Sequence, residues 1–495
     1  MADTKHKLHA LFIPYPLQGH LIPAVHLAIK LASKGFTITF VNTQAIHHQI
    51  SKAKSSSGSS NDNNDIFAHA RQSGLDIRYM TVSDGLPVEF NRSLNHDQFM
   101  ATLLHILSAH IDDLIRKITQ EGPPIACMIA DTFFVWPSTI AKKYGLINVS
   151  LWTEPALVFT LYYHMHLLRR HGHFACNDNR EDIIDYIPGV AAIDPADLPS
   201  YLQDADISTV VHQIIFKAFA EAKDADYILC NTVYELEPET ISALHIKKPF
   251  YAIGPTFPFN SSKSIVAMSL WPESDCTKWL DSKPAGSVLY ISFGSYAPVR
   301  KKDLEEIAMG VLHSQVNFIW VLRPYIMSSD AEDPLPVGFM EECRERGIIV
   351  PWCCQMAVLS HPSVGGFLTH CGWNSILESV WCGVPMLCYP LLTDQFTNHK
   401  LVVDDWKIGI DIRRCNRSVT RNEVSAKIKA LMATELGDDL RKEIKEVRRA
   451  LENTLKPNGS SEKNIDLFIE DLKNKVCAQY GTATSTSSSF NTKPH

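Results

Sequence analysis

The sequence has no C-x-x-C spacing among its 12 cysteines, and it lacks both the P-loop and the G-x-G-x-x-G phosphate-binding patterns. Scattered cysteines without such pairs favour free thiols in a reducing compartment over a disulfide framework. The missing glycine motifs count against binding of ATP or of a dinucleotide. No window approaches the roughly 18 to 20 consecutive apolar residues of a membrane span. We therefore expect a cytoplasmic protein with no transmembrane segment.

An excess of positive charge is also absent. The chain has 54 acidic residues against 47 Lys and Arg, which gives a formal net charge of −7. This balance argues against a broad nucleic-acid-binding face, so we expect no nucleic-acid partner. A length of 495 residues exceeds that of one ordinary core and predicts two domains.

Strand-like and helix-like segments alternate through most of the chain. Such alternation indicates parallel sheets with helical crossovers, and therefore an α/β protein with two doubly wound, Rossmann-like domains. The main segments predicted to be strands are 7–13, 36–42, 125–130, 226–231, 287–295, 317–322, 347–352 and 364–370.

A stretch rich in proline, glycine and serine, "GPTFPFNSSKSIVAMSLWPESD", divides the two alternating regions. Its composition is typical of a linker. The predicted organisation is a first domain at 1–253, the linker at 254–275, a second domain at 276–458, a C-terminal helix at 459–478 and a disordered polar tail at 479–495.

The sequence "HCGWNSILES" (370–379) follows an apolar run and precedes a helix-like segment. In a parallel sheet this is where ligands bind, and a helix beginning near Asn374 would direct free N–H groups at a phosphate. His370, Asn374 and Ser375 could add side-chain donors, and Gly372 could give access to the backbone. A second interpretation is also open: Ser375 and Glu378 fit the S-x-x-E pattern of a capping box, which needs no ligand.

The surrounding sequence favours the interpretation of 370–379 as a ligand-binding site. Residues 352–395 read "WCCQMAVLSHPSVGGFLTHCGWNSILESVWCGVPMLCYPLLTDQ". This segment closely resembles the signature box of the plant family 1 UDP-glycosyltransferases, which act on secondary metabolites and have the two-domain GT-B fold. The resemblance extends more loosely to both halves of the chain. One departure is Cys354, where the family usually has proline, and it removes a backbone restraint between Trp352 and Gln355.

The resemblance implies a binding site for a UDP-sugar. Trp352 would stack on uracil, Gln355 would help to hold the nucleoside, and Glu378 would accept hydrogen bonds from the ribose. The diphosphate would be faced by His370, Asn374 and Ser375, with Ser295 of "SFGS" as a further contact. The sugar would be held by Trp373, Asp394 and Gln395, with Thr153 of "LWTEPA" nearby. Gln395 is linked in the family to glucose more than to galactose.

The chemistry of sugar transfer requires a base that removes the proton of the acceptor hydroxyl. Histidine suits this role because its pKa lies near the operating pH, and a carboxylate on its second nitrogen fixes the tautomer. His20 of "PYPLQGH" matches the family's base, and Asp131, directly after "IACMIA", matches its partner carboxylate.

Two other patterns could suggest a metal site. Asp204 with Asp206, and Asp224 with Asp226, form D-x-D patterns, and "HMHLLRRHGH" (164–173) contains four histidines. Neither has the further ligands or the spacing of a metal site such as H-E-x-x-H. We interpret them as solvated surface or as an acceptor-facing segment, and expect a metal-independent enzyme.

Together these features predict an inverting UDP-glycosyltransferase that needs no cofactor. Its co-substrate is a UDP-sugar, and the expected sugar is glucose. The acceptor would be a small hydroxylated lipophilic compound bound by the first domain, through loops around 80–100 and 150–205. The resemblance also implies that the C-terminal helix returns to the first domain, and we expect a monomer. The alternative is a nucleotide-sugar-binding protein without catalytic activity.

Overall fold

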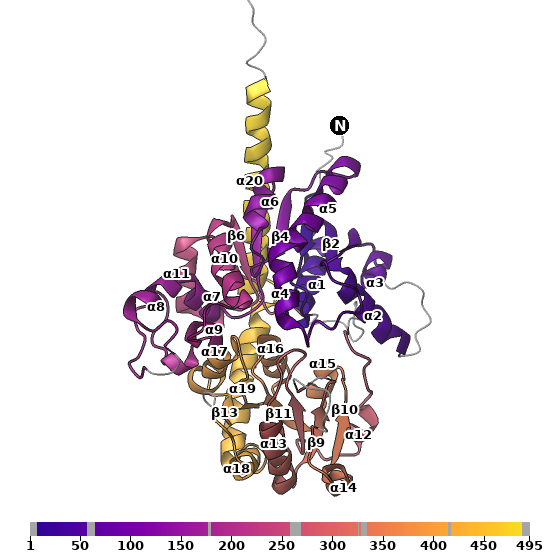
Figure 1. Cartoon of the computed structure of the whole chain (residues 1–495), viewed down its shortest axis with the longest axis vertical. Coiled ribbons are helices and arrows are strands. Elements are labelled where there is room, and N and C mark those ends of the chain that lie inside the picture. The colour runs from indigo at the N-terminus through magenta and orange to yellow at the C-terminus, as the bar shows by residue number, and fades with distance from the viewer. Residues whose placement is uncertain are drawn as a thin grey trace, which may run out of the picture.

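The computed structural model describes residues 7–56, 65–176, 180–257, 269–324, 326–327, 334–413 and 417–487. Two parallel sheets lie one above the other in Figure 1, the first formed by the N-terminal half of the chain and the second by the C-terminal half. The prediction of two α/β domains with parallel sheets is confirmed.

The first sheet has the strand order β3-β2-β1-β4-β5-β6-β7. Every pair is parallel, with His9 opposite Thr37 on one side of the first strand and Ala10 opposite Cys127 on the other. The strands are β1 (His9–Ile13), β2 (Thr37–Thr43), β3 (Ile77–Val82), β4 (Cys127–Asp131), β5 (Ile147–Trp152), β6 (Tyr227–Cys230) and β7 (Phe250–Ala252).

The second sheet has the order β10-β9-β8-β11-β12-β13 and is also parallel throughout. Its strands are β8 (Val288–Ser292), β9 (Asn317–Val321), β10 (Gly347–Val350), β11 (Val364–Thr369), β12 (Met386–Cys388) and β13 (Gly409–Asp411).

Helices cover both sheets. Those of the first half are α1 (Gln18–Ser33), α2 (Gln44–Ser56), α3 (Ala68–Gln72), α4 (His96–His105), α5 (Leu107–Glu121), α6 (Pro137–Tyr144), α7 (Ala156–Tyr163), α8 (Met165–His171), α9 (Ser200–Gln203), α10 (Val210–Asp224) and α11 (Pro238–Lys247). Those of the second half are α12 (Thr277–Asp281), α13 (Lys301–Ser314), α14 (Phe339–Cys343), α15 (Gln355–Leu359), α16 (Trp373–Cys382), α17 (Gln395–Lys400), α18 (Arg421–Ala433), α19 (Glu435–Thr454) and α20 (Ser460–Ser487). Short helical turns lie at Pro195–Asp197, Tyr234–Leu236 and Leu401–Asp405.

The central strands are buried along their whole length, which explains their sequence pattern. Every residue of β1, β4, β8 and β11 is buried. Parallel strands covered by helices on both faces read as continuous apolar runs rather than as alternating ones. The apolar runs therefore predict both the strands and their central positions in the sheets.

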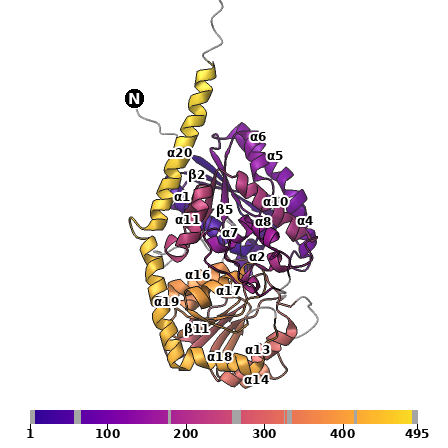
Figure 2. The same cartoon turned by 90° about the vertical axis from the view of Figure 1, so that its left-hand side faces the viewer.

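The helix α20 returns to the first half of the chain. Figure 2 shows α19 and α20 running along one side of the molecule, past both sheets. Ile465, Phe468, Ile469 and Leu472 of α20 are buried in the core around β1 and β2. At the helix surface Asn464 Nδ2 donates to Ala252 O over 2.8 Å.

The end of α20 differs from the prediction of a disordered tail at 479–495. The helix continues to Ser487, so 479–487 is helical, and 488–495 lies outside the described residues. A helix that is already nucleated extends at little cost, and the sequence has no proline between Ser460 and Lys493. Of the predicted linker, 258–268 lies outside the described residues, and β7 precedes the linker while β8 follows it. Among the helices described, none is long and apolar enough to cross a bilayer.

The packing of α20 predicts that the C-terminal helix stabilises the first half of the protein. Phe468 is 1% exposed, and its replacement by alanine should cost roughly 3 to 5 kcal/mol. We expect Phe468→Ala to lower the midpoint of thermal unfolding followed by circular dichroism. Leu467→Ala is a matched control, because the neighbouring Leu467 is 50% exposed. Equal midpoints for the two variants would contradict this account of α20.

Candidate active site

A cavity of about 860 Å³ lies between the two halves and is lined by residues of both. In each sheet the strand order reverses once near the middle, between β1 and β4 and between β8 and β11. Such reversal points are the usual ligand sites of doubly wound sheets. All the residues predicted for the site line this cavity except Asp131, which lies behind His20.

His20, Asp131 and Thr153 meet at the reversal point of the first sheet. His20 is in the first turn of α1, Asp131 ends β4, and Thr153 follows β5. His20 Nδ1 lies 2.8 Å from Asp131 Oδ2 and 3.0 Å from Thr153 Oγ1. Asp131 is 1% exposed, whereas the His20 side chain is 13% exposed and reaches the cavity. Nε2 is therefore the ring nitrogen available to a substrate.

Aromatic and apolar side chains surround His20 on the side of the first sheet. The ring centroids of Tyr15 and Phe133 both lie 5.5 Å from that of His20. The Tyr15 hydroxyl donates to Met100 Sδ over 3.3 Å, which fixes Met100 in the wall. Tyr201 and Ile214 complete this surface. The sequence did not single out these residues, because they come from separate segments and no motif links them.

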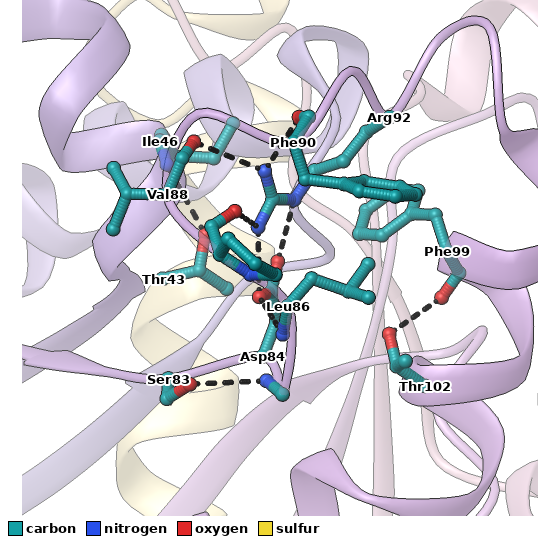
Figure 3. Close-up of polar contacts among 12 residues, drawn as sticks. Thr43, Ile46, Ser83, Asp84, Leu86, Val88, Phe90, Arg92, Phe99 and Thr102 are labelled. Atoms are coloured by element: carbon teal, nitrogen blue, oxygen red, sulfur yellow. Dashed lines mark hydrogen bonds and ion pairs between the residues drawn. The ribbon is translucent and has the colours of Figure 1, made fainter.

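An ion pair closes the loop that leads into α4. Arg92 binds Asp84 through two nitrogens, Nε to Oδ2 at 2.7 Å and Nη2 to Oδ1 at 2.9 Å. As Figure 3 shows, the same guanidinium also donates to loop carbonyls, including that of Phe90 at 3.0 Å. The loop therefore holds in place the start of α4, which brings His96 and Met100 to the cavity. His96 lies against Tyr296 of the second half, with ring centroids 5.4 Å apart.

The helix α16 begins at the reversal point of the second sheet. Gly372 is its N-cap and no side chain caps it, so Ser375 is the third helical residue. The capping-box interpretation of Ser375 and Glu378 is therefore wrong. Both side chains instead bind Gln355, whose Nε2 donates to Ser375 Oγ at 3.0 Å and to Glu378 Oε2 at 2.8 Å. The first turn of α16, whose backbone N–H groups have no partner within the helix, lines the cavity beside Ser375 and Glu378.

The imidazole of His370 is packed between two glycines. A Cβ atom added at Gly294 or at Gly372 would lie 2.4 Å from His370 Nε2, so both positions need glycine to make room for the ring. Burial lowers the pKa of His370 to about 4. At neutral pH the ring of His370 therefore carries no positive charge and can serve as a neutral hydrogen-bonding group. Its buried Nδ1 has no partner among the described residues.

Trp373 and Asn374 connect the start of α16 to the first half. Trp373 Nε1 donates to Asn231 O over 2.7 Å, so the indole N–H is not available to a sugar. Asn374 Nδ2 donates to Gly19 O over 2.7 Å, directly before His20. These side chains therefore position the two halves relative to each other. Trp373 can contact a ligand only through its backbone and the face or edge of its ring.

One end of the cavity has the groups expected for a nucleoside. Trp352 lines it and is partly buried, and Gln355 Oε1 accepts a hydrogen bond from the Tyr290 hydroxyl over 3.3 Å. Burial raises the pKa of Glu378 to about 7, although the hydrogen bond from Gln355 opposes the shift. A buried carboxyl that lacks a cation is suited to accept hydrogen bonds from ligand hydroxyls.

Asp394 and Gln395 lie at the start of α17. Thr393 Oγ1 donates to Asp394 Oδ1 at 2.6 Å, and Asn398 Nδ2 donates to Oδ2 at 2.5 Å. Gln395 Oε1 accepts the N–H of Leu391 at 2.9 Å, which fixes the amide and leaves its Nε2 as a donor. Thr393 also binds the first half, where its N–H donates to Ser200 Oγ over 2.9 Å.

Ser295 lies in the loop that follows β8 and lines the cavity. Arg323 organises this loop by donating to the carbonyls of Gly294 at 3.0 Å and Ala297 at 2.6 Å. Burial lowers the pKa of Arg323 to about 10, so the guanidinium remains charged at neutral pH. The described residues contain no cluster of three or more histidine, cysteine or carboxylate side chains that could hold a metal ion.

The raised pKa of Glu378 predicts a stability that depends on pH. The folded-state value of about 7 lies above the ordinary 4.5, so its contribution to stability is full below 4.5 and is lost as pH rises through 7. Glu378→Gln removes this titration. In the ligand-free protein it should therefore raise the melting temperature more at pH 8 than at pH 5. Glu443→Gln, an exposed carboxyl on α19, is the control. An equal gain for Glu378→Gln at both pH values would contradict the burial of an ionising carboxyl.

Cys354 occupies a conformation that proline can adopt. Its φ is −70° at the N-cap of α15, close to the value that proline fixes. We expect Cys354→Pro to raise the free energy of unfolding by about 0.4 to 1 kcal/mol, because proline restricts the unfolded chain. Chemical denaturation would measure the change, and Cys354→Ala would separate it from loss of the thiol. A destabilised proline variant would show that Cys354 N–H is needed.

Comparison with known proteins places this arrangement in a family. A family model described as UDP-glucoronosyl and UDP-glucosyl transferase matches residues 269–439. UDP-glycosyltransferase 86A1 of Arabidopsis thaliana is 59% identical over 476 residues, which are 95% of this chain and 95% of that protein. The 7-deoxyloganetin glucosyltransferase of Catharanthus roseus is 34% identical over 498 residues, 96% of this chain and 98% of that protein.

Solved structures of plant enzymes share the fold. The structure of Phytolacca americana UGT2 complexed with UDP-2fluoro-glucose and pterostilbene matches with a TM-score of 0.75 and 26% identity, covering 94% of this chain and 100% of that one. Os79 from O. sativa in complex with UDP matches with a TM-score of 0.77, also at 26% identity, with coverage of 94% and 100%. The chain therefore belongs to the plant family of UDP-glycosyltransferases with the GT-B fold, and it is a glycosyltransferase.

Proposed function

We propose that the protein transfers a hexose, glucose, from a UDP-sugar to a hydroxyl group of a small lipophilic acceptor, with inversion at the anomeric carbon and with His20 as the general base. The observation that carries the proposal is the contact between His20 Nδ1 and Asp131 Oδ2 at 2.8 Å, beside a cavity that both halves line.

The contact between His20 and Asp131 supports a base at Nε2. Asp131 accepts a hydrogen bond from the N–H at Nδ1, which keeps the proton on Nδ1 and leaves Nε2 unprotonated and directed to the substrate. The carboxylate also stabilises the imidazolium that forms when Nε2 takes a proton. As Nε2 takes the proton of the acceptor hydroxyl, the acceptor oxygen bonds to the anomeric carbon. The bond from that carbon to the diphosphate oxygen breaks, and UDP leaves with the electron pair. A single displacement of this kind inverts the configuration.

The second half of the chain would hold the donor. Trp352, Gln355 and Glu378 form the end suited to uracil and ribose. The diphosphate would lie at the start of α16, where free N–H groups and the helix dipole favour negative charge. His370 would act there as a neutral hydrogen-bond donor through Nδ1, and Ser295 and Ser375 would add hydroxyl groups. The solved relative complexed with UDP-2fluoro-glucose supports a UDP-sugar as the donor.

The sugar would lie between α17 and His20. The carboxylate of Asp394 and the Nε2 group of Gln395 can bind sugar hydroxyls, and the family pattern at Gln395 favours glucose. The acceptor would occupy the surface formed by Tyr15, Met100 and Phe133, whose apolar character favours a lipophilic compound. The domain at 1–253 would thus bind the acceptor and the domain at 276–458 the donor.

The proposal is tested by mixing the purified protein with UDP-glucose and a pooled library of hydroxylated plant metabolites, and by searching for products with one added hexose. His20→Ala should lose about 10²- to 10⁴-fold in rate, the usual contribution of a general base. Asp131→Asn should also be impaired, because the amide favours the wrong tautomer of His20. His69→Ala, which removes an exposed histidine of α3, is the control.

The outcomes separate the enzyme from a non-catalytic binding protein. A hexosylated product that His20→Ala fails to form supports the proposed base and identifies the acceptor. Wild-type rates in His20→Ala would exclude His20 as the base. Binding of UDP without any product, from UDP-glucose or from other UDP-sugars, would favour the non-catalytic alternative.

A further inference from the structure

Glu154 is a carboxyl group in the wall of the cavity that the proposed reaction does not use. It follows Thr153, whose hydroxyl contacts His20, and it lines the same cavity as His20 and Asp394. Its Oε2 is buried and has no hydrogen-bond partner among the described residues. Buried polar atoms are almost always paired in folded proteins, so an unpaired one in a ligand cavity points to a group supplied by the ligand.

The backbone around Glu154 is fixed from several sides. Trp152 Nε1 donates to Pro155 O over 2.9 Å, and Cys230 Sγ contacts Glu154 O at 3.4 Å. The buried carboxylate of Glu237 accepts the N–H groups of Ala156 at 3.0 Å and Leu157 at 2.7 Å, at the start of α7. The position of Glu154 is thus set before a substrate arrives, as expected of a residue that selects ligands.

The charges near Glu154 are those of other carboxyl groups. Burial, and then the carboxylates of Asp394 and Asp131, raise its pKa well above the ordinary value. Burial also raises the pKa of Asp394, which Thr393 and Asn398 nevertheless stabilise by hydrogen bonds. Among the described residues that line the cavity, Arg448 is the only lysine or arginine, and its charge acts to lower the pKa of Cys382. A bound anion near Glu154 would therefore lie close to the carboxyl groups of Asp394 and Asp131, whose charges raise the pKa of Glu154. His20, which acts to lower the pKa of Asp394, can supply a positive charge there only as an imidazolium.

We infer that Glu154 is a specificity-determining residue: its carboxyl group binds a hydroxyl group of a neutral substrate next to His20, and this part of the cavity rejects substrates that carry a carboxylate. The inference rests on the proposed function and specifies its substrate class. The enzyme would form glycosides of neutral hydroxyl compounds. It would not form sugar esters of carboxylic acids, and it would not transfer a uronic acid from its UDP donor.

The hydroxyl group could belong to the acceptor or to the sugar, and kinetics with two variants distinguish these sources. Glu154→Gln keeps the size and the hydrogen bonding of a neutral carboxyl, whereas Glu154→Leu removes both polar atoms. We expect the glutamine variant to stay within about threefold of the wild type. The leucine variant should raise the KM of one substrate about tenfold, the effect of one lost hydrogen bond, with kcat nearly unchanged.

A comparison of UDP-glucose with UDP-xylose as donors identifies the hydroxyl group that Glu154 binds. A rise in KM for the acceptor alone assigns Glu154 to the acceptor. A rise for UDP-glucose but not for UDP-xylose, which lacks the hydroxymethyl group, assigns it to that group, and a rise for both donors assigns it to a ring hydroxyl. Changes below about twofold in every KM would overturn the inference. So would equal losses of kcat in both variants together with a lower melting temperature, because these indicate a structural role.

Two controls keep the result specific to Glu154. Glu273→Leu removes another cavity-lining carboxyl, next to Cys354 at the nucleoside end, and should leave the KM of the acceptor unchanged. The affinity for UDP itself, which has neither sugar nor acceptor, should be the same in wild type, Glu154→Gln and Glu154→Leu. A loss of UDP affinity in the Glu154 variants would place the defect elsewhere and overturn the inference.

The second arm tests the rejection of anions with matched acceptors, in which carboxylic acids such as 4-hydroxybenzoate are paired with their methyl esters. We expect kcat/KM to favour the esters by about tenfold or more at pH 7, because like charges in an interface oppose binding. UDP-glucuronate should likewise be a poorer donor than UDP-glucose. Equal or better use of the acids would overturn the inference while leaving the transferase intact. No transfer to any neutral or acidic compound would instead count against the proposed function, and with it against this inference.

Discussion

The docking of the start of α16 onto the first half determines most of the geometry of the site. The indole N–H of Trp373 donates to the carbonyl of Asn231, and the amide of Asn374 donates to the carbonyl of Gly19. The first turn of α16, in the second half, is thus hydrogen-bonded to the residue before His20. The reversal points of the two sheets therefore face each other with a defined separation. The hydrogen bonds from Thr393 to Ser200 and from Thr397 to the carbonyl of Asp197 add to these two contacts, so several bonds together fix the distance between His20 and the start of α16.

Burial shifts the pKa values of several titratable groups in the cavity. Burial drives His370 to its neutral form and raises the pKa values of Glu154, Glu378 and Asp394. Each of these groups can form hydrogen bonds with a ligand, and such bonds would offset part of the cost of burial. The buried polar groups of the cavity thus reduce the free energy of unfolding at the positions where a ligand binds. Such a trade-off between stability and activity is common in proteins. Ligand binding should accordingly stabilise the fold, by an amount set by the affinity and concentration of the ligand.

The sequence predicted the elements that carry continuous apolar runs, and the residues that belong to one local motif. The box at 352–395 predicted that Trp352, Gln355, His370 and Glu378 share one site, and all four line one cavity because α15, β11 and α16 follow one another in the chain. It did not predict that the indole of Trp373 is already bound, since the partner Asn231 is remote in the chain. Glu154 was missed for the same reason: its importance lies in what surrounds it. Five strands were also not identified: β3, β5, β7, β12 and β13. The last three have only three residues each, too few to establish a period.

The return of α20 to the first half has a consequence for synthesis of the protein. The ribosome produces the first half early, yet Phe468, Ile469 and Leu472, which complete its core, are among the last parts of the chain to emerge. Throughout translation of the second half, the apolar residues of the first half that pack against α20 therefore remain without this partner. Nascent chains should depend on chaperones during this interval. Premature termination anywhere after the linker would yield a first half that is fully synthesised but unable to finish folding.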